Sequence, residues 1–160
     1  MKKIIIAAIS ENNIIGKNGI LPWKSKEEMT VFKQLTTNNP VIMGRKTYDS
    51  LKRVLKGRTN LILSHSVNER NEKKEVKFFN SFSSVYKFCE KENYEKVFII
   101  GGGEVFKEEI NNVDEMFISI MKGDFEGDVF FPEINENIWH INMVVYYSDF
   151  ILYKYIRNSN

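Results

Sequence analysis

The sequence predicts an α/β protein built on a largely parallel β-sheet, and three observations support this class. Short, nearly continuous apolar runs recur along the chain, as in strands that are buried on both faces. Segments with helical periodicity separate these runs, which is the alternation expected of βαβ units. Near the C-terminus, two strand-like segments follow each other across a tight turn. We therefore expect the sheet to end in an antiparallel hairpin.

The first strand is expected at residues 4–9, directly after Met1-Lys2-Lys3. A charged start followed by an apolar run imitates a signal peptide. The run is short, however, and polar residues follow it without a small-residue cleavage site. No apolar run approaches the ~20 residues of a membrane span. We therefore expect a cytoplasmic protein that does not bind membranes.

The remaining elements follow in order along the chain. Helical periodicity predicts four helices near residues 25–37, 45–52, 82–92 and 103–111. Apolar runs predict further strands at residues 41–43, 61–63, 97–100 and 116–120. The C-terminal hairpin is expected to join residues 141–147 to residues 150–156.

Length and composition are those of an ordinary globular chain. With 160 residues and no linker, we expect one domain over residues 1–160. The 23 basic and 21 acidic residues give a net charge of only +2, which argues against nucleic-acid binding. One cysteine, Cys89, excludes an intrachain disulfide and fits a reducing compartment. The two histidines lie far apart, and no metal-site spacing is present.

Glu28 is the most informative single residue, because it lies where a helix would be expected to carry a leucine. At about 100° per residue, it shares one helical face with Val31, Phe32 and Leu35. A carboxyl group buried there would hold a proton more tightly, which suits a proton donor or hydrogen-bond anchor. Ser25-x-x-Glu28 is also a capping box, in which the carboxylate turns back to the helix start. The segment alone leaves both interpretations open.

Three predicted strand ends carry groups that suit an anionic ligand, and ligands of open α/β sheets bind at such ends. Gly101-Gly102-Gly103 leads into the helix start Glu104-Val105-Phe106, where N–H groups can meet a phosphate. Gly44-Arg45-Lys46-Thr47 begins another helix, and Ser64-His65-Ser66 follows Leu63. Taken alone, each motif has an ordinary alternative. The first could be a tight turn, the second a solvated basic pair and the third a polar turn. Together the motifs fit a dinucleotide with an extra 2′-phosphate.

Six segments form an ordered set along the chain: Ile15-Gly16…Leu21-Pro22-Trp23, Glu28…Phe32-Lys33, Pro40-Val41-Ile42-Met43-Gly44-Arg45-Lys46-Thr47, Leu55-Lys56-Gly57-Arg58-Thr59-Asn60, Ile100-Gly101-Gly102-Gly103 and Glu126-Gly127-Asp128…Phe131-Pro132. Each segment alone is common, whereas six in this order and spacing are specific. Over nearly its whole length, the chain resembles dihydrofolate reductase of the bacterial type.

The resemblance implies an eight-stranded, mostly parallel sheet flanked by four helices, in a monomeric protein. It implies NADPH-dependent reduction of 7,8-dihydrofolate to 5,6,7,8-tetrahydrofolate in one-carbon metabolism, with antifolates as further ligands. Hydride would pass from nicotinamide C4 to pterin C6, and N5 would be protonated. Glu28 would be the one ionisable group of the pterin site, bonded to the ring nitrogen and the 2-amino group.

The resemblance also implies roles for individual residues. The reaction would involve Glu28, Trp23, Leu21 and Ser119. Trp23 would fix a water near the pterin, and Leu21 would lie on a mobile loop over residues 16–21. Arg58 would hold the glutamate α-carboxylate of the substrate, and Gly101-Gly102 would form a cis peptide.

Two larger sets follow from the same comparison. The substrate pocket would be formed by Ile6, Ala8, Glu28, Met29, Phe32, Leu51, Leu55, Arg58, Ile100 and Ser119. The NADPH site would be formed by Ala8, Ile15, Gly16, Asn18, Gly19, Leu21, Gly44, Arg45, Lys46, Thr47, Leu63, Ser64, His65, Ser66, Ile100, Gly101, Gly102, Gly103, Glu104, Val105 and Phe106.

The sequence departs from the family's pattern in places. Ser119 stands where many relatives have threonine, which keeps the hydroxyl that would bond Glu28, and Phe106 replaces a frequent tyrosine. The C-terminal hairpin loop, Tyr147-Ser148-Asp149, is shorter than in many relatives. Two alternatives to the leading interpretation are a reductase of a related pterin-like or pyrimidine-like substrate and a nucleotide-binding module without chemistry. Arg58 argues against the first, because it fits a substrate with a glutamate tail. The presence of the acid Glu28 argues against the second.

Overall fold

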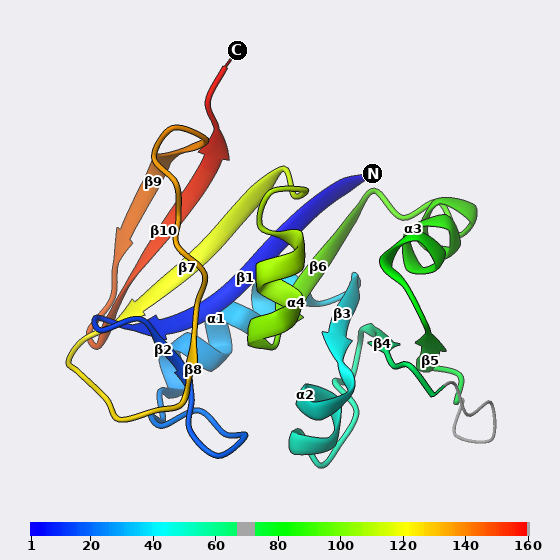
Figure 1. Cartoon of the computed structure of the whole chain (residues 1–160), viewed down its shortest axis with the longest axis horizontal. Helices are drawn as coiled ribbons and strands as arrows, with labels where there is room; N and C mark the ends of the chain where they lie inside the picture. Colours follow the sequence, from blue (N-terminus) through cyan, green and yellow to red (C-terminus); the bar gives the residue numbers. More distant parts are fainter. Residues whose placement is uncertain (67–72, 160) are drawn as a thin grey trace.

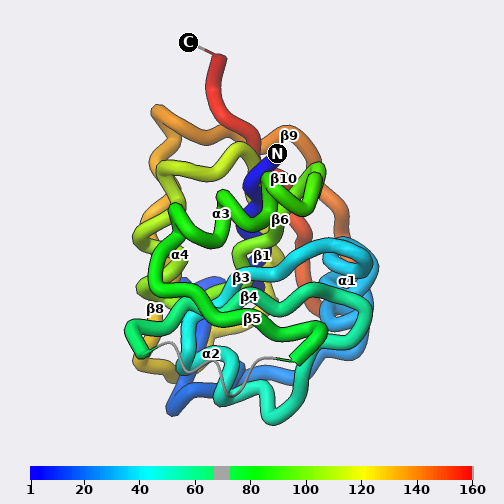
Figure 2. The backbone as a smooth tube through the Cα atoms, turned by 90° about the vertical axis from the view of Figure 1, so that its right-hand side faces the viewer, coloured from blue at the N-terminus to red at the C-terminus, as the bar shows by residue number. Residues whose placement is uncertain are grey.

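The computed structural model describes residues 1–66 and 73–159 and contains an eight-stranded sheet with helices on both faces (Figures 1 and 2). The strand order is β5-β4-β3-β6-β1-β7-β10-β9. These strands are β1 (Lys2–Ser10), β3 (Pro40–Gly44), β4 (Thr59–Leu63), β5 (Val76–Phe79), β6 (Lys96–Gly101), β7 (Glu115–Met121), β9 (Trp139–Tyr146) and β10 (Phe150–Arg157). A separate two-stranded ladder pairs β2 (Ile14–Gly16) with β8 (Val129–Phe130).

The sheet is mostly parallel, as predicted. Every pairing from β5 across to β7 is parallel, whereas β10 pairs antiparallel with both β7 and β9. The predicted C-terminal hairpin therefore exists, and it adds the last two strands at one edge of the sheet (Figure 1). The parallel strands are apolar on both faces because helices cover both faces.

Successive residues of β1 divide the core between the two faces. Ile5, Ala7 and Ile9 point into the cluster beneath α3 (Phe82–Lys91) and α4 (Gly103–Glu109). Ile4 and Ile6 point into the opposite cluster. Residues of α1 (Lys26–Thr36) and α2 (Arg45–Ser50) pack against that second cluster. Figure 2 shows α1 on one side of the strands and both α3 and α4 on the other.

The four helices lie where helical periodicity predicts them, with ends that differ by one or two residues. Seven strands of the main sheet coincide with the predicted apolar runs and hairpin, and β5 is the eighth. The short strands β2, β5 and β8 had no counterpart among the apolar runs. Cys89 is a fully buried free thiol in α3, and burial raises its pKa to about 12, so it is inert as a nucleophile. No helix in the described ranges is long and apolar enough to cross a membrane.

Candidate active site

The first turn of α1 places Glu28 in the interior. Ser25 is the N-cap, and its Oγ accepts a hydrogen bond of 3.1 Å from the Glu28 backbone N–H. The Glu28 side chain does not return this bond, and no donor among the described residues reaches its carboxylate. The residue is only 8% exposed. The burial interpretation is therefore confirmed, whereas the capping box is only half formed: Ser25 caps the backbone, but the carboxyl group of Glu28 does not turn back to the helix start.

The environment of Glu28 favours its protonated form. Burial is the larger cause and the negative charge of Asp149 the smaller, and together they raise the pKa of Glu28 from 4.5 to about 7. At neutral pH the group is thus present in both protonation states. Such a carboxyl group can accept or donate a proton under physiological conditions.

Two further predicted residues lie around this acid. The buried Nε1 of Trp23 has no hydrogen-bond partner among the described residues, and its ring contacts Phe125 edge-on at 5.3 Å between centroids. A buried N–H donor without a partner suits a water or a polar ligand group. Ser119 is buried on β7, opposite Ala8 of β1. Within the described residues, however, no hydrogen bond joins Ser119 to Glu28.

A set of half-buried apolar side chains continues from α1 towards α2. Phe32, Leu51, Leu55 and Ile100 are half-buried and pack against the same core cluster, which contains Ile6. Met29, in contrast, is 60% exposed. A flat aromatic ligand could lie against Phe32 while one end meets Glu28, because both side chains come from α1.

Arg58 lies at the far end of α1 from Glu28. Its Nη1 donates to Thr36 Oγ1 at 3.1 Å, and its Nε donates to the Lys56 carbonyl at 3.1 Å. The guanidinium carbon lies 5.7 Å from the centroid of the Phe32 ring. Burial lowers the pKa of Arg58 from its ordinary value, although a guanidinium stays charged at neutral pH. Its Nη2 has no partner among the described residues, so this cation is fixed in place yet can still donate.

The glycines of β3 and β6 bring two helix starts together. Met43 of β3 pairs with Gly101 of β6, and Gly101–Gly102 is a cis peptide, as expected. A Cβ on Gly102 would lie 3.1 Å from Thr47 Oγ1, and one on Gly44 would lie 3.3 Å from a Val105 methyl. Neither α2 nor α4 has a side-chain cap at its N-terminus. Free backbone N–H groups therefore face this narrow junction, which suits an anionic group.

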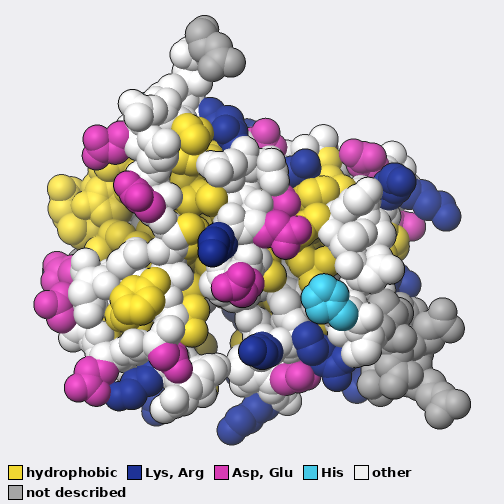
Figure 3. Space-filling model, viewed as in Figure 1, with side chains coloured by type: hydrophobic (Ala, Val, Ile, Leu, Met, Phe, Trp, Pro, Cys, Tyr) yellow, Lys and Arg dark blue, Asp and Glu magenta, His cyan; other side chains and the backbone are white. Residues whose placement is uncertain are grey.

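The cationic residues expected at the junction of β3 and β6 make few contacts with the rest of the protein. Arg45 Nε pairs with Asp49 at 3.1 Å, an exposed contact within α2, and its guanidinium lies 5.4 Å from the Phe78 ring. Lys46, His65 and Ser66 are exposed, whereas Ser64 is buried and its Oγ donates to the Ser66 carbonyl. Gly44 pairs with Leu63, so the ends of β3 and β4 adjoin. Figure 3 shows a hollow beside α2 with Lys and Arg side chains along that side.

The predicted loop over residues 16–21 is a tight turn. Lys17 and Ile20 exchange backbone hydrogen bonds of 2.8 and 3.1 Å, and Asn18 and Gly19 adopt positive φ. The loop leaves Leu21 50% exposed and Ile20 64% exposed. It is tied to the segment before β8, because the Asp128 N–H donates to the Gly16 carbonyl at 3.1 Å.

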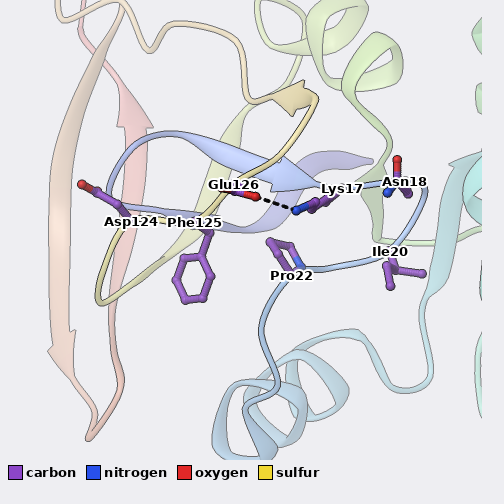
Figure 4. A pocket seen from close by; sticks show the side chains of 7 residues that line it. All are labelled: Lys17, Asn18, Ile20, Pro22, Asp124, Phe125 and Glu126. Carbon is purple, nitrogen blue, oxygen red and sulfur yellow. Dashed lines mark hydrogen bonds and ion pairs between the residues drawn. The ribbon is translucent and has the colours of Figure 1, made fainter.

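A cavity of about 520 Å³ separates this loop from residues 124–126. Figure 4 shows the ion pair of 2.8 Å between Lys17 and Glu126 across it, with Pro22 and Phe125 at its wall. Its lining does not include Glu28 or Arg58, and of the predicted site residues it contains Asn18.

The sequence analysis missed one set of contacts at this site. Ser148 Oγ, in the turn between β9 and β10, donates to Glu27 Oε2 at 2.7 Å. This bond brings the neighbouring Asp149 to the first turn of α1. Nothing in the local sequence indicates it, because 121 residues separate the partners. A polar Ser-Asp pair at a turn is otherwise ordinary.

Comparisons with known proteins agree on one family. A family model described as dihydrofolate reductase matches residues 3–149. Dihydrofolate reductase of Haemophilus influenzae is 37% identical over 142 residues, which cover 89% of this chain and 86% of that protein. The enzyme of Mycoplasma genitalium is 36% identical over 158 residues and 98% of each chain. The solved structure of dihydrofolate reductase from Enterococcus faecalis, complexed with NADP(H) and RAB-propyl, has a TM-score of 0.87 at 31% identity, covering 99% of this chain and 97% of that one.

Proposed function

Because the chain belongs to the dihydrofolate reductase family and has that family's NADPH-dependent reductase activity, we propose that Glu28 is the acid of the reaction. The observation that carries this proposal is the inward-turned Glu28 carboxyl group, whose pKa is raised to about 7. An acid that is half protonated near neutrality can bind a pterin ring and also promote protonation of N5. Ser25 and the α1 backbone hold it in place.

The substrate 7,8-dihydrofolate would extend along α1 from Glu28 to Arg58. Its pterin ring would meet the Glu28 carboxyl group through paired hydrogen bonds to the ring nitrogen and 2-amino group. Phe32, Leu51 and Leu55 would cover the rings, and Ile6, Ala8, Met29, Ile100 and Ser119 would complete the pocket. Arg58 would pair with the glutamate α-carboxylate, since its guanidinium is fixed by Thr36 and Lys56.

The residues around the two glycine-rich strand ends fit NADPH. The close approach of Gly102 to Thr47 and of Gly44 to Val105 leaves room only for backbone, and N–H groups of two uncapped helix starts face the junction. Gly44, Arg45, Lys46, Thr47, Leu63, Ser64, His65 and Ser66 would hold the adenosine and its 2′-phosphate. Gly101, Gly102, Gly103, Glu104, Val105 and Phe106 would hold the pyrophosphate. When bound, NADPH supplies the hydride that reduces pterin C6.

The loop over residues 16–21 would exclude water from the reacting groups. Ile15, Gly16, Asn18, Gly19 and Leu21 would border the nicotinamide together with the backbone of Ala8 and Ile100. The exposed side chain of Leu21 gives this loop apolar surface that closure could bury. Trp23 would bind a water near the pterin through its unpartnered Nε1.

A pterin-like or pyrimidine-like substrate on the same fold is the second candidate. The position of Arg58 favours dihydrofolate. Its Nε and Nη1 already donate within the protein, and a substrate without a carboxylate tail would leave the rest of the guanidinium without a ligand. We also propose that antifolates bind in the same pocket, and that the protein works as a cytoplasmic monomer.

The assay is to mix the protein with NADPH and dihydrofolate and to follow nicotinamide absorbance. Glu28→Gln should keep NADPH binding and lose most turnover at neutral pH, because it removes the acid and leaves the phosphate-binding residues intact. Glu27→Gln changes the exposed neighbour and serves as the matched control. Undiminished turnover of Glu28→Gln would refute the role of Glu28, and flat absorbance with the unmodified protein would refute the substrate.

A further inference from the structure

The turn between β9 and β10 is fastened to the start of α1. Ser148 donates two hydrogen bonds to the Glu27 carboxylate, from Oγ at 2.7 Å and from the backbone N–H at 3.4 Å. On the other side of the turn, Lys122 Nζ donates to the Ser148 carbonyl at 2.8 Å, and the Lys122 N–H donates to the Asp149 carbonyl at 3.0 Å. Asp149 is thus held from both sides, beside the helix turn that carries Glu28.

Packing fixes the same turn from beneath. Phe150, the next residue, is fully buried and stacks on Tyr147 at 4.5 Å with an interplanar angle of 8°. It belongs to the core cluster that contains Val31 of α1, with Trp23 packed against that cluster. These contacts fix the backbone from which the Asp149 side chain extends.

The Asp149 carboxylate is itself unusual. Its Oδ1 is buried and has no hydrogen-bond partner among the described residues. A buried acceptor that lacks a partner typically costs about 1–3 kcal/mol, so it calls for an explanation. Of the buried side-chain atoms without partners in the described residues, Trp23 Nε1 and Asp149 Oδ1 both belong to segments that pack around the start of α1.

Of the described charged residues near the start of α1, Asp149 is the one whose charge affects Glu28. Burial and, among the charges of the described residues, that of Asp149 raise the pKa of Glu28. Glu27 is exposed and bonded to Ser148, Lys122 is exposed and directed at the Ser148 carbonyl, and Lys24 and Lys26 are exposed on the helix start. Solvent screens such exposed charges more strongly than the half-buried Asp149.

We propose that Asp149 is a positioning residue for the reductase reaction, whose carboxylate disfavours negative charge on Glu28 and so keeps this acid in its hydrogen-donating form at neutral pH. The proposal rests on the proposed role of Glu28. It adds that the C-terminal hairpin, through the identity of one turn residue, sets the pH range in which the reaction runs.

Asp149→Asn tests the proposal, because it removes the charge and keeps the shape of the side chain. The pH profile of the hydride-transfer step, followed in single turnovers, should have an inflection set by Glu28. In Asp149→Asn we expect this inflection roughly one pH unit lower, with rates unchanged on the acid side and up to about tenfold lower on the alkaline side. Asp149→Glu keeps the charge and should restore a profile close to that of the unmodified protein.

Asp124→Asn is the matched control, because it makes the same change at an exposed carboxylate next to Phe125, whose ring contacts Trp23. Its profile should coincide with that of the unmodified protein. An unshifted inflection in Asp149→Asn, or equal shifts in Asp149→Asn and Asp124→Asn, would overturn the proposal. If the asparagine variant does not fold, Asp149→Ser provides a smaller neutral side chain for the same measurement.

The two proposals fail in different ways. If Glu28→Gln keeps the inflection of the unmodified protein, the role of Glu28 itself is wrong. If Glu28→Gln abolishes the inflection while Asp149→Asn leaves it in place, Glu28 keeps its role and only the inference about Asp149 falls.

Discussion

Replacing Arg58 with leucine is expected to weaken dihydrofolate binding strongly and to change stability little. In the proposed complex, Arg58 forms a bidentate pair with the substrate α-carboxylate. Hydrogen bonds to charged groups contribute about 1.5–3 kcal/mol each, so two of them, partly offset by desolvation, give roughly 3 kcal/mol. Since every 1.4 kcal/mol is a factor of ten, the KM for dihydrofolate should rise on the order of a hundredfold.

The cost to folding should be small for a structural reason. Leucine removes the Nη1 bond to Thr36, but the Thr36 hydroxyl still donates to the Phe32 carbonyl at 2.8 Å. The Lys56 carbonyl belongs to an exposed residue and can turn to water. No buried polar atom loses its last partner, and the partly apolar environment over Phe32 accepts a leucine. We expect the free energy of unfolding to change by about 1 kcal/mol, since ordinary hydrogen bonds have net values of that size.

The assay compares two substrates in steady-state kinetics, dihydrofolate and an analogue that lacks the glutamate tail. For Arg58→Leu, KM should rise for dihydrofolate and stay the same for the truncated analogue, with kcat nearly unchanged for both. Arg53→Leu, an exposed arginine of the same segment, is the matched control. An unchanged KM for dihydrofolate, or an equal rise for both substrates, would refute the tail-binding role of Arg58.

Three further predictions concern the acid, the cofactor and the loop. Glu28→Gln should be up to about 3 kcal/mol more stable than the unmodified protein above pH 7 and equally stable near pH 4, measured by urea unfolding without ligands. The sign follows because the folded pKa of about 7 exceeds the ordinary 4.5, so the unmodified protein loses stability as the pH rises between these values; parallel pH dependences would contradict it. NADPH should raise the melting temperature more than NADH at equal concentration, and Arg45→Ala should narrow this difference; equal shifts would remove the 2′-phosphate assignment. Gly127→Ala should lower the free energy of unfolding by about 1–3 kcal/mol, because the added Cβ would collide with an Ile14 methyl and lie 2.5 Å from the Gly16 carbonyl oxygen. Gly16→Ala is the control, because a Cβ there has room. Matching denaturation curves for the two variants would argue against the prediction.

Most of the fold could be predicted from the sequence because its main strands are buried on both faces. The apolar runs of β1, β3, β4, β6 and β7 are nearly continuous, and a sheet covered by helices on both faces buries them. The four-residue β5 alternates buried and half-buried positions, and a run of that length carries little periodic signal. The ladder of β2 and β8 is shorter still, and it exists because the chain folds back through Gly127, a contact that local sequence does not encode.

For Glu28, local reasoning left two interpretations, and the structure decides between them. The capping box predicts where the helix begins, and the Ser25 bond agrees with it. The apolar face formed with Val31 predicts burial, and the exposed fraction agrees with that. Only the Ser25 half of the capping box is formed, because it uses the backbone N–H of Glu28, whereas the carboxyl group lies in the interior and not at the helix start. Residue spacing alone does not separate these two parts of one residue.

The strength of the acid, in contrast, depends on a tertiary contact that no local pattern encodes. The hairpin turn could be placed from sequence, since two apolar segments flank Ser148-Asp149. The contact of this turn with the start of α1 could not be predicted, because the bond from Ser148 to Glu27 spans 121 residues. Family resemblance assigns Glu28 to the reaction through residues near it in the motif, but Asp149 lies outside every matched motif. If the Asp149 charge acts as proposed, two relatives with identical motifs and different hairpin turns should differ in the pH at which hydride transfer slows, and exchanging this one turn residue should move that pH from one to the other.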